Sequence, residues 1–205
     1  MLNPDVVLKN DTILNINKSI SELENFAILS PLSDNPLYPN YRGNSVETIK
    51  DDSKSISNVE EIDGYSMIIN KECFEDNIYF DEKFFMYLEN IDLCLRAKKN
   101  GGKLYIVTNS KVHHLGAKAV DDKYSEEIEL SRNWHWMWSK FYFNKKHRGF
   151  FVSTLLGFIT LLENFLKYII YMITFNKKRN IYRMRMSGII NSLLGRQSWY
   201  RPEIN

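Results

Sequence analysis

Acidic residues at two places in this 205-residue chain could carry out chemistry. Asp5 follows Asn3-Pro4, where a carboxylate could bind a divalent cation or could simply complete a turn. Glu89 and Asp92 are three positions apart, so on a helix both carboxylates share one face and could together take a proton from a hydroxyl. The alternative is a solvated first turn of a helix, in which both carboxylates favour the helix dipole.

Two adjacent histidines are a third candidate. His113 and His114 follow Val112 on an expected strand, where neighbouring side chains point to opposite faces. At most one of the two therefore faces a given site. A neutral imidazole can bind a divalent ion, although a surface or structural histidine is the commoner case. No single candidate identifies a function.

The elements that must position these residues alternate between strands and helices. Strands are expected over 1–9, 65–69 and 103–107, and another from Val112. Helices are expected over 16–30, 84–100 and 123–143, with a helical turn at 71–77. Ser19 or Ser21 could cap the first helix, and Gly101-Gly102 should end the second. Residues 30–57, rich in Pro, Asn and Ser, should form a long loop, and the whole pattern predicts an α/β protein.

Composition excludes several classes of protein. A hydrophobic share of 44% and a charged share of 25% are typical of a globular chain, not of a disordered, collagen-like or polytopic membrane protein. Cys73 and Cys94 have no CxxC spacing, so they exclude a disulfide framework and a Cys-rich zinc site and fit a reducing compartment. No secretory signal peptide is expected at the start.

Charge divides the chain into two parts. Residues 1–140 carry 16 Lys and Arg against 23 Asp and Glu, a net charge of −7, whereas residues 141–205 carry 11 against 2, a net charge of +9. Between Gly149 and Phe175 the only charged residues are Glu163 and Lys167. The bases gather at the two ends of this apolar stretch, which favours an anionic membrane over nucleic acid as its partner.

The apolar stretch is about long enough to cross a bilayer, since roughly 20 residues suffice. Glu163 and Lys167 in its middle, and bases on both flanks, oppose a crossing. These two residues are spaced i,i+4 and could pair on one helical face. We expect in-plane or re-entrant amphipathic helices on the cytoplasmic leaflet. The alternative is a buried helix of a soluble domain.

Read together, these residues resemble the second half of a family 2 glycosyltransferase, in particular the bacterial rhamnosyltransferase-like branch. The match comprises Leu-Asn-Pro-Asp-Val at 2–6, Asp-Gly at 63–64, and a long signature at 80–96 that reads FDEKFFMYLENIDLCLR. A glycine, a strand and a Val-x-His element follow over 101–114, and an aromatic Arg-Asn-Trp region lies at 132–134. The resemblance spans residues 1 to about 150.

This resemblance implies an incomplete GT-A type fold, Rossmann-like, that uses a nucleotide-diphosphate sugar with Mg2+ or Mn2+. Asp5 would bind the metal, and His114, or next His113, would complete the metal site. Such a metal offsets the charge of the departing diphosphate. The implied partners are the sugar donor and a saccharide or lipid-linked acceptor, and no nucleic acid.

An inverting enzyme also needs a carboxylate base for the acceptor hydroxyl. The family has Asp directly after the Glu of its signature, where this chain has Asn90. We therefore expect Glu89 to be the base and Asp92 to position the acceptor or the helix. The matched segments also imply that the substrates contact Asp63, Gly64, Tyr87 and Asn90.

The expected organisation has residues 1–148 as the acceptor and catalytic half of a GT-A domain and residues 149–205 as a basic, apolar, membrane-associated helical tail. The family's nucleotide-binding half would precede Leu2, so the chain is expected to be truncated or to work with a separate nucleotide-binding chain. The resemblance implies an inverting transfer of a sugar such as rhamnose to a cell-surface polysaccharide, on the inner face of the cell membrane. The alternative is a non-catalytic remnant that binds membrane or a partner. Trp134, Trp136 and Trp138 fit acceptor stacking or plain core packing.

Overall fold

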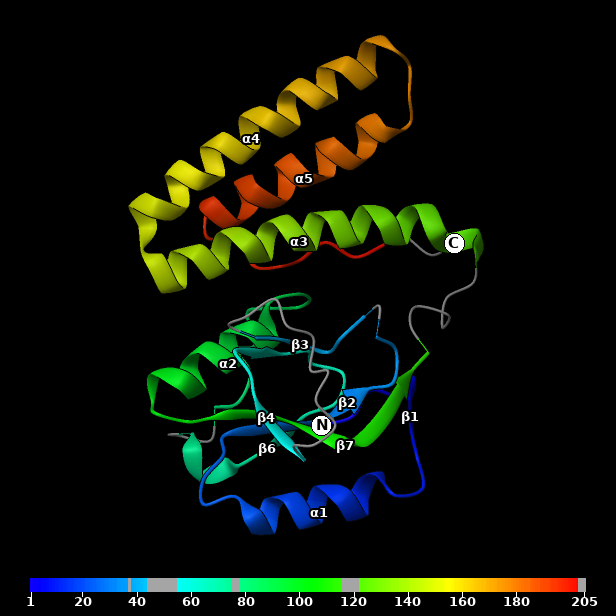
Figure 1. Cartoon of the computed structure of the whole chain (residues 1–205). Helices are drawn as coiled ribbons and strands as arrows, with labels where there is room; N and C mark the ends of the chain where they lie inside the picture. The colour runs from blue at the N-terminus through cyan, green and yellow to red at the C-terminus, as the bar shows by residue number, and fades with distance from the viewer. Residues whose placement is uncertain (37, 44–54, 75–77, 116–121, 203–205) are drawn as a thin grey trace. The chain divides into compact units, whose positions relative to one another are not determined.

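The chain forms a mixed α/β structure followed by three long helices (Figure 1). The computed structural model describes residues 1–36, 38–43, 55–74, 78–115 and 122–202. Two compact units are present: an α/β unit of residues 1–81 and 90–119, and a helical unit of residues 82–89 and 120–205. The predicted α/β class is confirmed. The division differs from the expected boundary after Arg148, because the helix that ends there packs against the helices that follow it.

A mixed sheet organises the α/β unit. Its strands lie in the order β1 (Val6–Leu8), β7 (Leu104–His114), β2 (Ile28–Ser33) and β6 (Ile68–Ile69), and β4 (Ile56–Asn58) also pairs with β7. Only the β2–β7 pair is parallel among these described strands. A second, two-stranded sheet consists of β3 (Tyr41–Arg42) and β5 (Glu61–Ile62).

Strand β7 is longer than the sequence predicts. The two strands expected at 103–107 and from Val112 are one continuous strand of 11 residues. Its first part pairs with β2 and β4, and its last part pairs antiparallel with β1, where Val6 is opposite His114. Because one strand bridges both neighbours, the turn at Pro4-Asp5 lies beside the end of β7.

The helix predicted over 16–30 is misplaced. Helix α1 (Thr12–Glu22) begins earlier, and neither Ser19 nor Ser21 caps it. It ends early because Ala27, Ile28 and Leu29 are a continuous apolar run, all fully buried, that forms a central strand rather than one face of a helix.

Pro31 lies within β2, and the pairing with β7 shifts register immediately after it. Buried Asn40 satisfies the backbone there: its amide nitrogen donates to the Pro31 carbonyl at 2.8 Å, and its Oδ1 accepts from the Ser33 N–H at 2.9 Å. The expected long loop over 30–57 therefore contains β3, part of β2 and part of β4, while its residues 37 and 44–54 lie outside the described residues. The predicted turn at 71–77 contains the 3-10 helix η1 (Lys71–Cys73), and residues 75–77 also lie outside.

Helix α2 (Glu89–Lys99) is shorter at its start than the predicted 84–100. Tyr87 and Leu88 have φ angles of 71° and 67°, in the left-handed region, so they cannot belong to a right-handed helix. Gly101 follows the helix with φ of 80°, as its predicted role in ending the helix requires.

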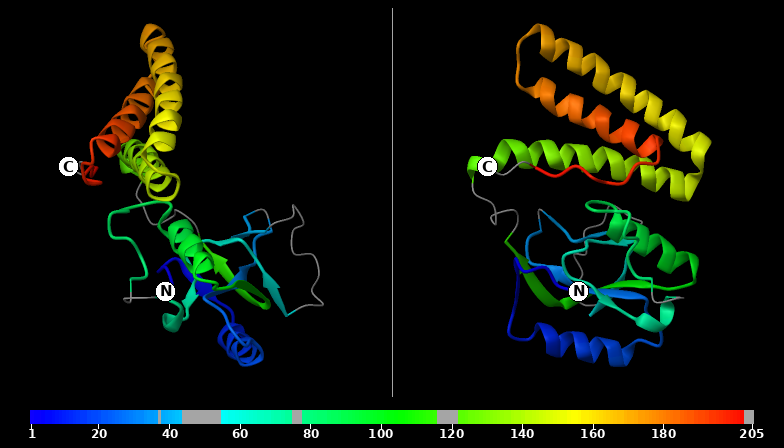
Figure 2. Two further views of the ribbon diagram at one scale, coloured as in Figure 1. Left: turned by 90° about the vertical axis from the view of Figure 1, so that its left-hand side faces the viewer. Right: turned by 180° about the vertical axis from the view of Figure 1, so that it is seen from behind.

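The helical unit consists of α3 (Ser125–Arg148), α4 (Phe150–Ile173) and α5 (Lys178–Leu193), with the 3-10 helix η3 (Asp122–Tyr124) before them. Helix α5 packs against both α3 and α4, and Figure 2 shows the α4–α5 pair from two further sides. Trp134, Trp138 and Met184 form one of its apolar clusters. Of the three tryptophans considered for acceptor stacking, Trp134 and Trp138 are thus core residues, whereas Trp136 is 39% exposed.

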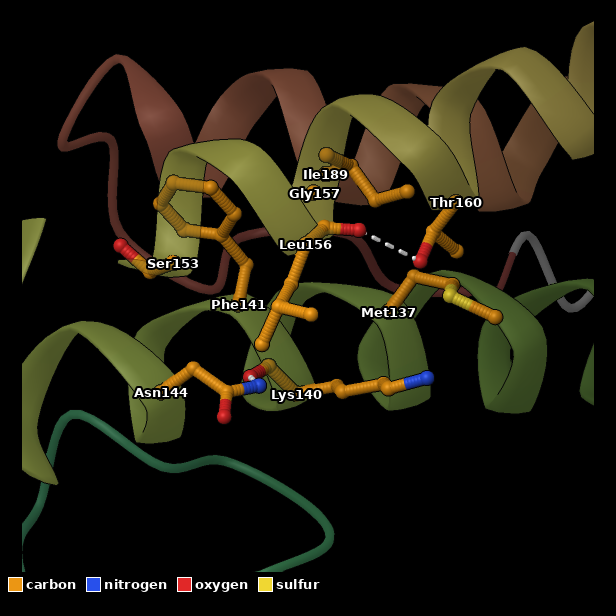
Figure 3. A pocket seen from close by; sticks show the side chains of 9 residues that line it. All are labelled: Met137, Lys140, Phe141, Asn144, Ser153, Leu156, Gly157, Thr160 and Ile189. Carbon is orange, nitrogen blue, oxygen red and sulfur yellow. Dashed lines mark hydrogen bonds between the residues drawn. The ribbon is translucent and has the colours of Figure 1, made fainter. Parts of the chain in front are cut away.

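A small gap remains where the three helices meet (Figure 3). Its volume is about 20 Å³, enough for a single water molecule. The Thr160 hydroxyl beside it donates to the Leu156 carbonyl at 2.8 Å within α4. We interpret this gap as an imperfection of helix packing.

Helix α4 is exposed along most of its length. By length and composition it could cross a membrane. Only 6% of its most apolar 18-residue window is buried in the structure. This exposure argues against the alternative of a buried helix in a soluble domain. The predicted pairing within α4 is confirmed, because Lys167 Nζ lies 2.5 Å from Glu163 Oε1.

Candidate functional site

The two residues expected to bind a metal lie side by side in the α/β unit. His114 Nε2 is 3.0 Å from Asp5 Oδ2, and each side chain is about one-third exposed, at 32% and 29%. The pairing follows from the β1–β7 ladder, which continues beyond the strands as the Leu115 N–H donates to the Asp5 carbonyl at 2.9 Å. The contact is therefore held by backbone on both sides.

Tyr65 orients the His114 ring. The two rings stack with centroids 4.3 Å apart and planes 11° from parallel. The Asn3 N–H donates to the Tyr65 carbonyl at 2.9 Å, so the segment after Asp63-Gly64 is fixed to the Asn-Pro-Asp turn. Sequence reasoning missed Tyr65. Its place directly after the Asp-Gly pair was the one available signal.

Asp63 contributes a second carboxylate to the electrostatics of this site. Burial by its surroundings raises the pKa of Asp63, and the positive charges of Arg42 and His114 act in the opposite direction. The Asp63 N–H donates to the Asn40 carbonyl at 2.8 Å, which fixes the start of the Asp-Gly pair. We call Asp5, Asp63, Tyr65 and His114 the β7-end site.

His113 points away from the β7-end site, as the alternation along a strand predicts. Its Nδ1 lies 2.9 Å from Asp34 Oδ1, and Lys9 Nζ lies 3.0 Å from the other oxygen of Asp34. Although desolvation would raise the pKa of Asp34, the hydrogen bonds from His113 and Lys9 lower it. These three residues form a separate surface network, so the structure separates the two candidate histidines.

Glu89 begins α2 immediately after the two left-handed residues. Burial raises the pKa of Glu89, and its own backbone N–H acts in the opposite direction. Its Oε2 atom is buried and has no hydrogen-bond partner among the described residues. Glu89 thus combines a raised pKa, an unpartnered oxygen and two preceding residues with left-handed backbone. Such a combination is typical of a proton acceptor in a functional site.

Tyr87 belongs to the helical unit. Its ring meets that of Trp136 edge to face, with centroids 5.5 Å apart, and burial raises the pKa of its hydroxyl. This ring contact helps to fix the left-handed segment that precedes Glu89.

The Asn90 side chain holds the start of α2 against the segment that contains Ile62. Its amide nitrogen donates to the Ile62 carbonyl at 3.0 Å, and its Cβ would lie 3.2 Å from a Cβ added at Gly64. The fold therefore uses both residues for the close approach of α2 to the Asp63-Gly64 turn. An aspartate at position 90 could not donate this hydrogen bond.

Asp92 is fully buried and pairs with Arg96. The Arg96 Nε atom donates to Asp92 Oδ2 at 2.8 Å, and the same guanidinium donates to the carbonyls of Ile78 and Tyr79. This carboxylate thus fixes the segment before α2 through Arg96. The carboxylates of Glu89 and Asp92 have different environments, and only that of Glu89 retains an unpartnered oxygen.

The residues of the β7-end site fit a divalent cation that receives its remaining ligands from elsewhere. One carboxylate and one imidazole are present at adjacent positions, and Mg2+ is commonly held by one or two carboxylates plus substrate phosphates and water. Within the described parts of the chain, no group of three or more His, Cys, Asp or Glu could hold a metal by itself. Asp5 and His114 are the two donors that fit.

Comparison with known proteins adds no relative: the chain matches no protein-family model, no curated protein and no solved structure.

Proposed function

We propose that this chain is the acceptor and catalytic part of an inverting, metal-dependent glycosyltransferase of GT-A type, similar to the rhamnosyltransferase-like branch of family 2. The observation that carries the proposal is the 3.0 Å approach of Asp5 and His114. The resemblance selects these two residues from opposite ends of the α/β unit's sequence, without any use of their positions in space.

In the proposed reaction, Asp5 and His114 hold Mg2+ or Mn2+. The ion would supply charge neutralisation for the diphosphate of the sugar donor. Tyr65 keeps the His114 imidazole oriented, and Asp63 adds negative charge beside it. The saccharide or lipid-linked acceptor would give its hydroxyl proton to Glu89, because burial raises the pKa of this carboxyl and so makes it a stronger base.

The experiment that tests this proposal is a titration of the purified chain with Mn2+, alone and with nucleotide-diphosphate sugars, by calorimetry. We expect Mn2+ to bind and to be required for binding of the sugar donor. Asp5→Asn and His114→Gln should each weaken Mn2+ binding at least tenfold, on the order of 1.4 kcal/mol.

His113→Gln is the matched control, because His113 faces Asp34 instead of Asp5. It should leave Mn2+ binding unchanged. A folded chain that binds no Mn2+, or equal effects of the two histidine variants, would overturn the metal assignment.

A second candidate function is favoured by helix α4, which exposes apolar side chains and has basic residues at both ends. These features support a module that binds the cytoplasmic membrane surface, with or without turnover. A chain that binds anionic vesicles but neither Mn2+ nor a sugar donor would favour this candidate, a non-catalytic membrane- or partner-binding module.

A further inference from the structure

The helical unit contains a cavity of about 500 Å³, much larger than the packing gap between α3 and α4. It is enclosed by α3, by the segment after α5, and by the residues at 82–85. Its lining residues are Glu82, Lys83, Phe85, Trp138, Tyr142, Lys145, Ser192, Gly195, Arg196, Gln197, Ser198 and Arg201. We call it the basic cavity, because it has four cationic side chains and one carboxylate.

The wall after α5 is fixed in place by hydrogen bonds to α3. Gly195 has φ of 72° and turns the chain back, so that the Trp138 indole can donate to the Arg196 carbonyl at 3.0 Å. Fully buried His135 lies 2.8 Å from the Ser198 hydroxyl and 2.8 Å from the Tyr200 carbonyl. Desolvation lowers the pKa of His135, so the ring is neutral and donates from Nε2 to the Tyr200 carbonyl. The cavity is therefore preformed.

Carbonyl oxygens and aromatic rings together position the cations around the cavity. Arg201 Nη1 donates to the carbonyls of Ser198 and Tyr200, and Arg196 Nη1 donates to the Asn191 side chain. The Arg201 guanidinium lies 3.5 Å from the centroid of the Phe85 ring, and Lys145 Nζ lies 5.7 Å from that of Phe150. Ring contacts of this kind position a cation while leaving its N–H groups able to bind an anion. Among the described residues of the lining, Glu82 is the one acidic side chain against four cationic ones, so this part of the cavity has a net positive charge.

Ser192 gives an independent indication of a ligand. This residue is 3% exposed, and its hydroxyl is buried without a hydrogen-bond partner among the described residues. An unpaired buried hydroxyl costs free energy. A phosphate oxygen in the cavity would give it an acceptor, in a setting where Arg and Lys already favour an anion.

The first residue of α4, a helix with exposed apolar side chains, lies next to one of the cations that line the cavity. Lys145 contacts Phe150, the first residue of α4, and the exposed side chains of that helix include Phe151 at 89% and Phe158 at 63%. A ligand that places a phosphate among the cations could therefore extend an apolar chain along α4. A free phosphate would use only the first of these two features.

We propose that the basic cavity binds the phosphate or diphosphate group of a single-chain amphiphile whose hydrocarbon chain lies along α4. In the proposed glycosyl transfer this ligand would be the lipid carrier of the acceptor saccharide, and the saccharide would supply the hydroxyl. The inference rests on that function only in treating the ligand as this carrier. Phosphate binding at this site needs neither the divalent metal nor the sugar donor.

The test is calorimetric titration of the full chain with farnesyl diphosphate, inorganic pyrophosphate and farnesol, with EDTA present to remove divalent metals. Farnesyl diphosphate should bind at least about tenfold more tightly than pyrophosphate, because its chain buries apolar surface. Farnesol should bind more weakly than the diphosphate, and added salt should weaken diphosphate binding.

Ser192→Ala is the most informative variant, since its hydroxyl makes no hydrogen bond within the described protein and its removal should leave the fold intact. It should weaken farnesyl diphosphate binding about tenfold, as expected for a hydrogen bond to a charged group. Arg196→Gln should weaken it at least as much. Lys178→Gln, at the start of α5 and outside the cavity lining, is the charge-matched control and should have no effect.

Equal affinities for pyrophosphate and farnesyl diphosphate would overturn the lipid assignment. Unchanged affinity in both Ser192→Ala and Arg196→Gln would overturn the site itself. Because EDTA is present, loss of the proposed Mn2+ site by Asp5→Asn should not alter these results. Failure of this inference and failure of the proposed function are therefore distinguishable.

Discussion

The side chains of the conspicuous acidic signature have three different roles. Asp92 is buried and paired, Asn90 donates to a backbone carbonyl, and only Glu89 has an unpartnered oxygen and a raised pKa. These three residues are close in sequence, yet their side chains have different surroundings, because each meets a different part of the fold around α2.

Asn90→Asp should destabilise the protein. The new carboxylate could not donate to the Ile62 carbonyl and would place negative charge against it, at a cost of about 1–3 kcal/mol. Urea unfolding would measure this loss. Asn133→Asp is the control and should cost less, because the Asn133 side chain donates within its own helix, to the Glu129 carbonyl. A neutral or stabilising Asn90→Asp would show that the amide does not hold the Asp63-Gly64 turn.

Glu89→Gln should stabilise the protein at neutral pH while removing the proposed proton acceptor. Burial raises the pKa of Glu89 above its ordinary value of 4.5, so the folded state favours the protonated carboxyl. That favourable contribution is fully present below pH 4.5 and is lost as the pH rises through the folded-state pKa.

The Glu89→Gln variant has no carboxyl at this position and does not lose this contribution. Its free energy of unfolding should therefore exceed that of the unaltered protein by an amount that grows from acidic to neutral pH. A gap in stability that stays constant over this range would contradict the burial of an ionisable carboxyl at position 89.

At the scale of elements, β7 and α5 position the two candidate sites. Strand β7 carries His114 to the β1 turn, and the C-terminal end of α5 carries Ser192 into the basic cavity. Helix α5 can approach α3 closely because Gly188 has no side chain. A Cβ at this position would lie 2.4 Å from the Trp134 carbonyl oxygen.

Gly188→Ala should therefore separate α5 from α3 and destabilise the helical unit by about 2 kcal/mol or more. Gly195→Ala is a useful comparison, because a Cβ there meets open space and the cost, about 1 kcal/mol, comes only from its positive φ. Thermal unfolding followed by tryptophan fluorescence would rank the two. The reverse order would mean that α5 does not approach α3 as closely as described.

Considered as a whole molecule, the chain combines an acidic α/β unit with a basic helical part that has an exposed apolar helix. Apolar side chains on α4, with bases before and after it, favour binding to an anionic membrane surface. The exposed Glu163–Lys167 pair places charge in the middle of α4, which opposes a full crossing.

The full chain should therefore float with vesicles that contain phosphatidylglycerol and bind pure phosphatidylcholine weakly. Phe151→Glu combined with Phe158→Glu should reduce the binding at least about tenfold, since each substitution removes a large apolar group and adds a repelled charge. Both side chains are exposed, at 89% and 63%, so the fold should be unaffected. Tyr38→Glu, an equally exposed aromatic of the α/β unit, is the control and should bind as the unaltered chain does.

Much of this organisation could be read from local sequence. The alternation of apolar and polar runs predicted the α/β class, the spacing of Glu163 and Lys167 predicted their pairing, and strand geometry placed His113 and His114 on opposite faces. Each of these depends on residues within a turn or two of one another. The end of α1 and the start of α2 were misjudged because burial of the 27–29 run and the left-handed Tyr87 and Leu88 override local helix propensity.

Only the tertiary structure decided which residues meet. That β7 is one strand, and so brings Asp5 to His114, depends on pairing between segments far apart in the chain. The basic cavity likewise depends on a turn at Gly195 that folds Arg196 and Arg201 back along α3. The sequence by itself determined the α/β class and how charge is distributed, because these depend on composition and near neighbours. The sites required long-range packing, which no local pattern encodes.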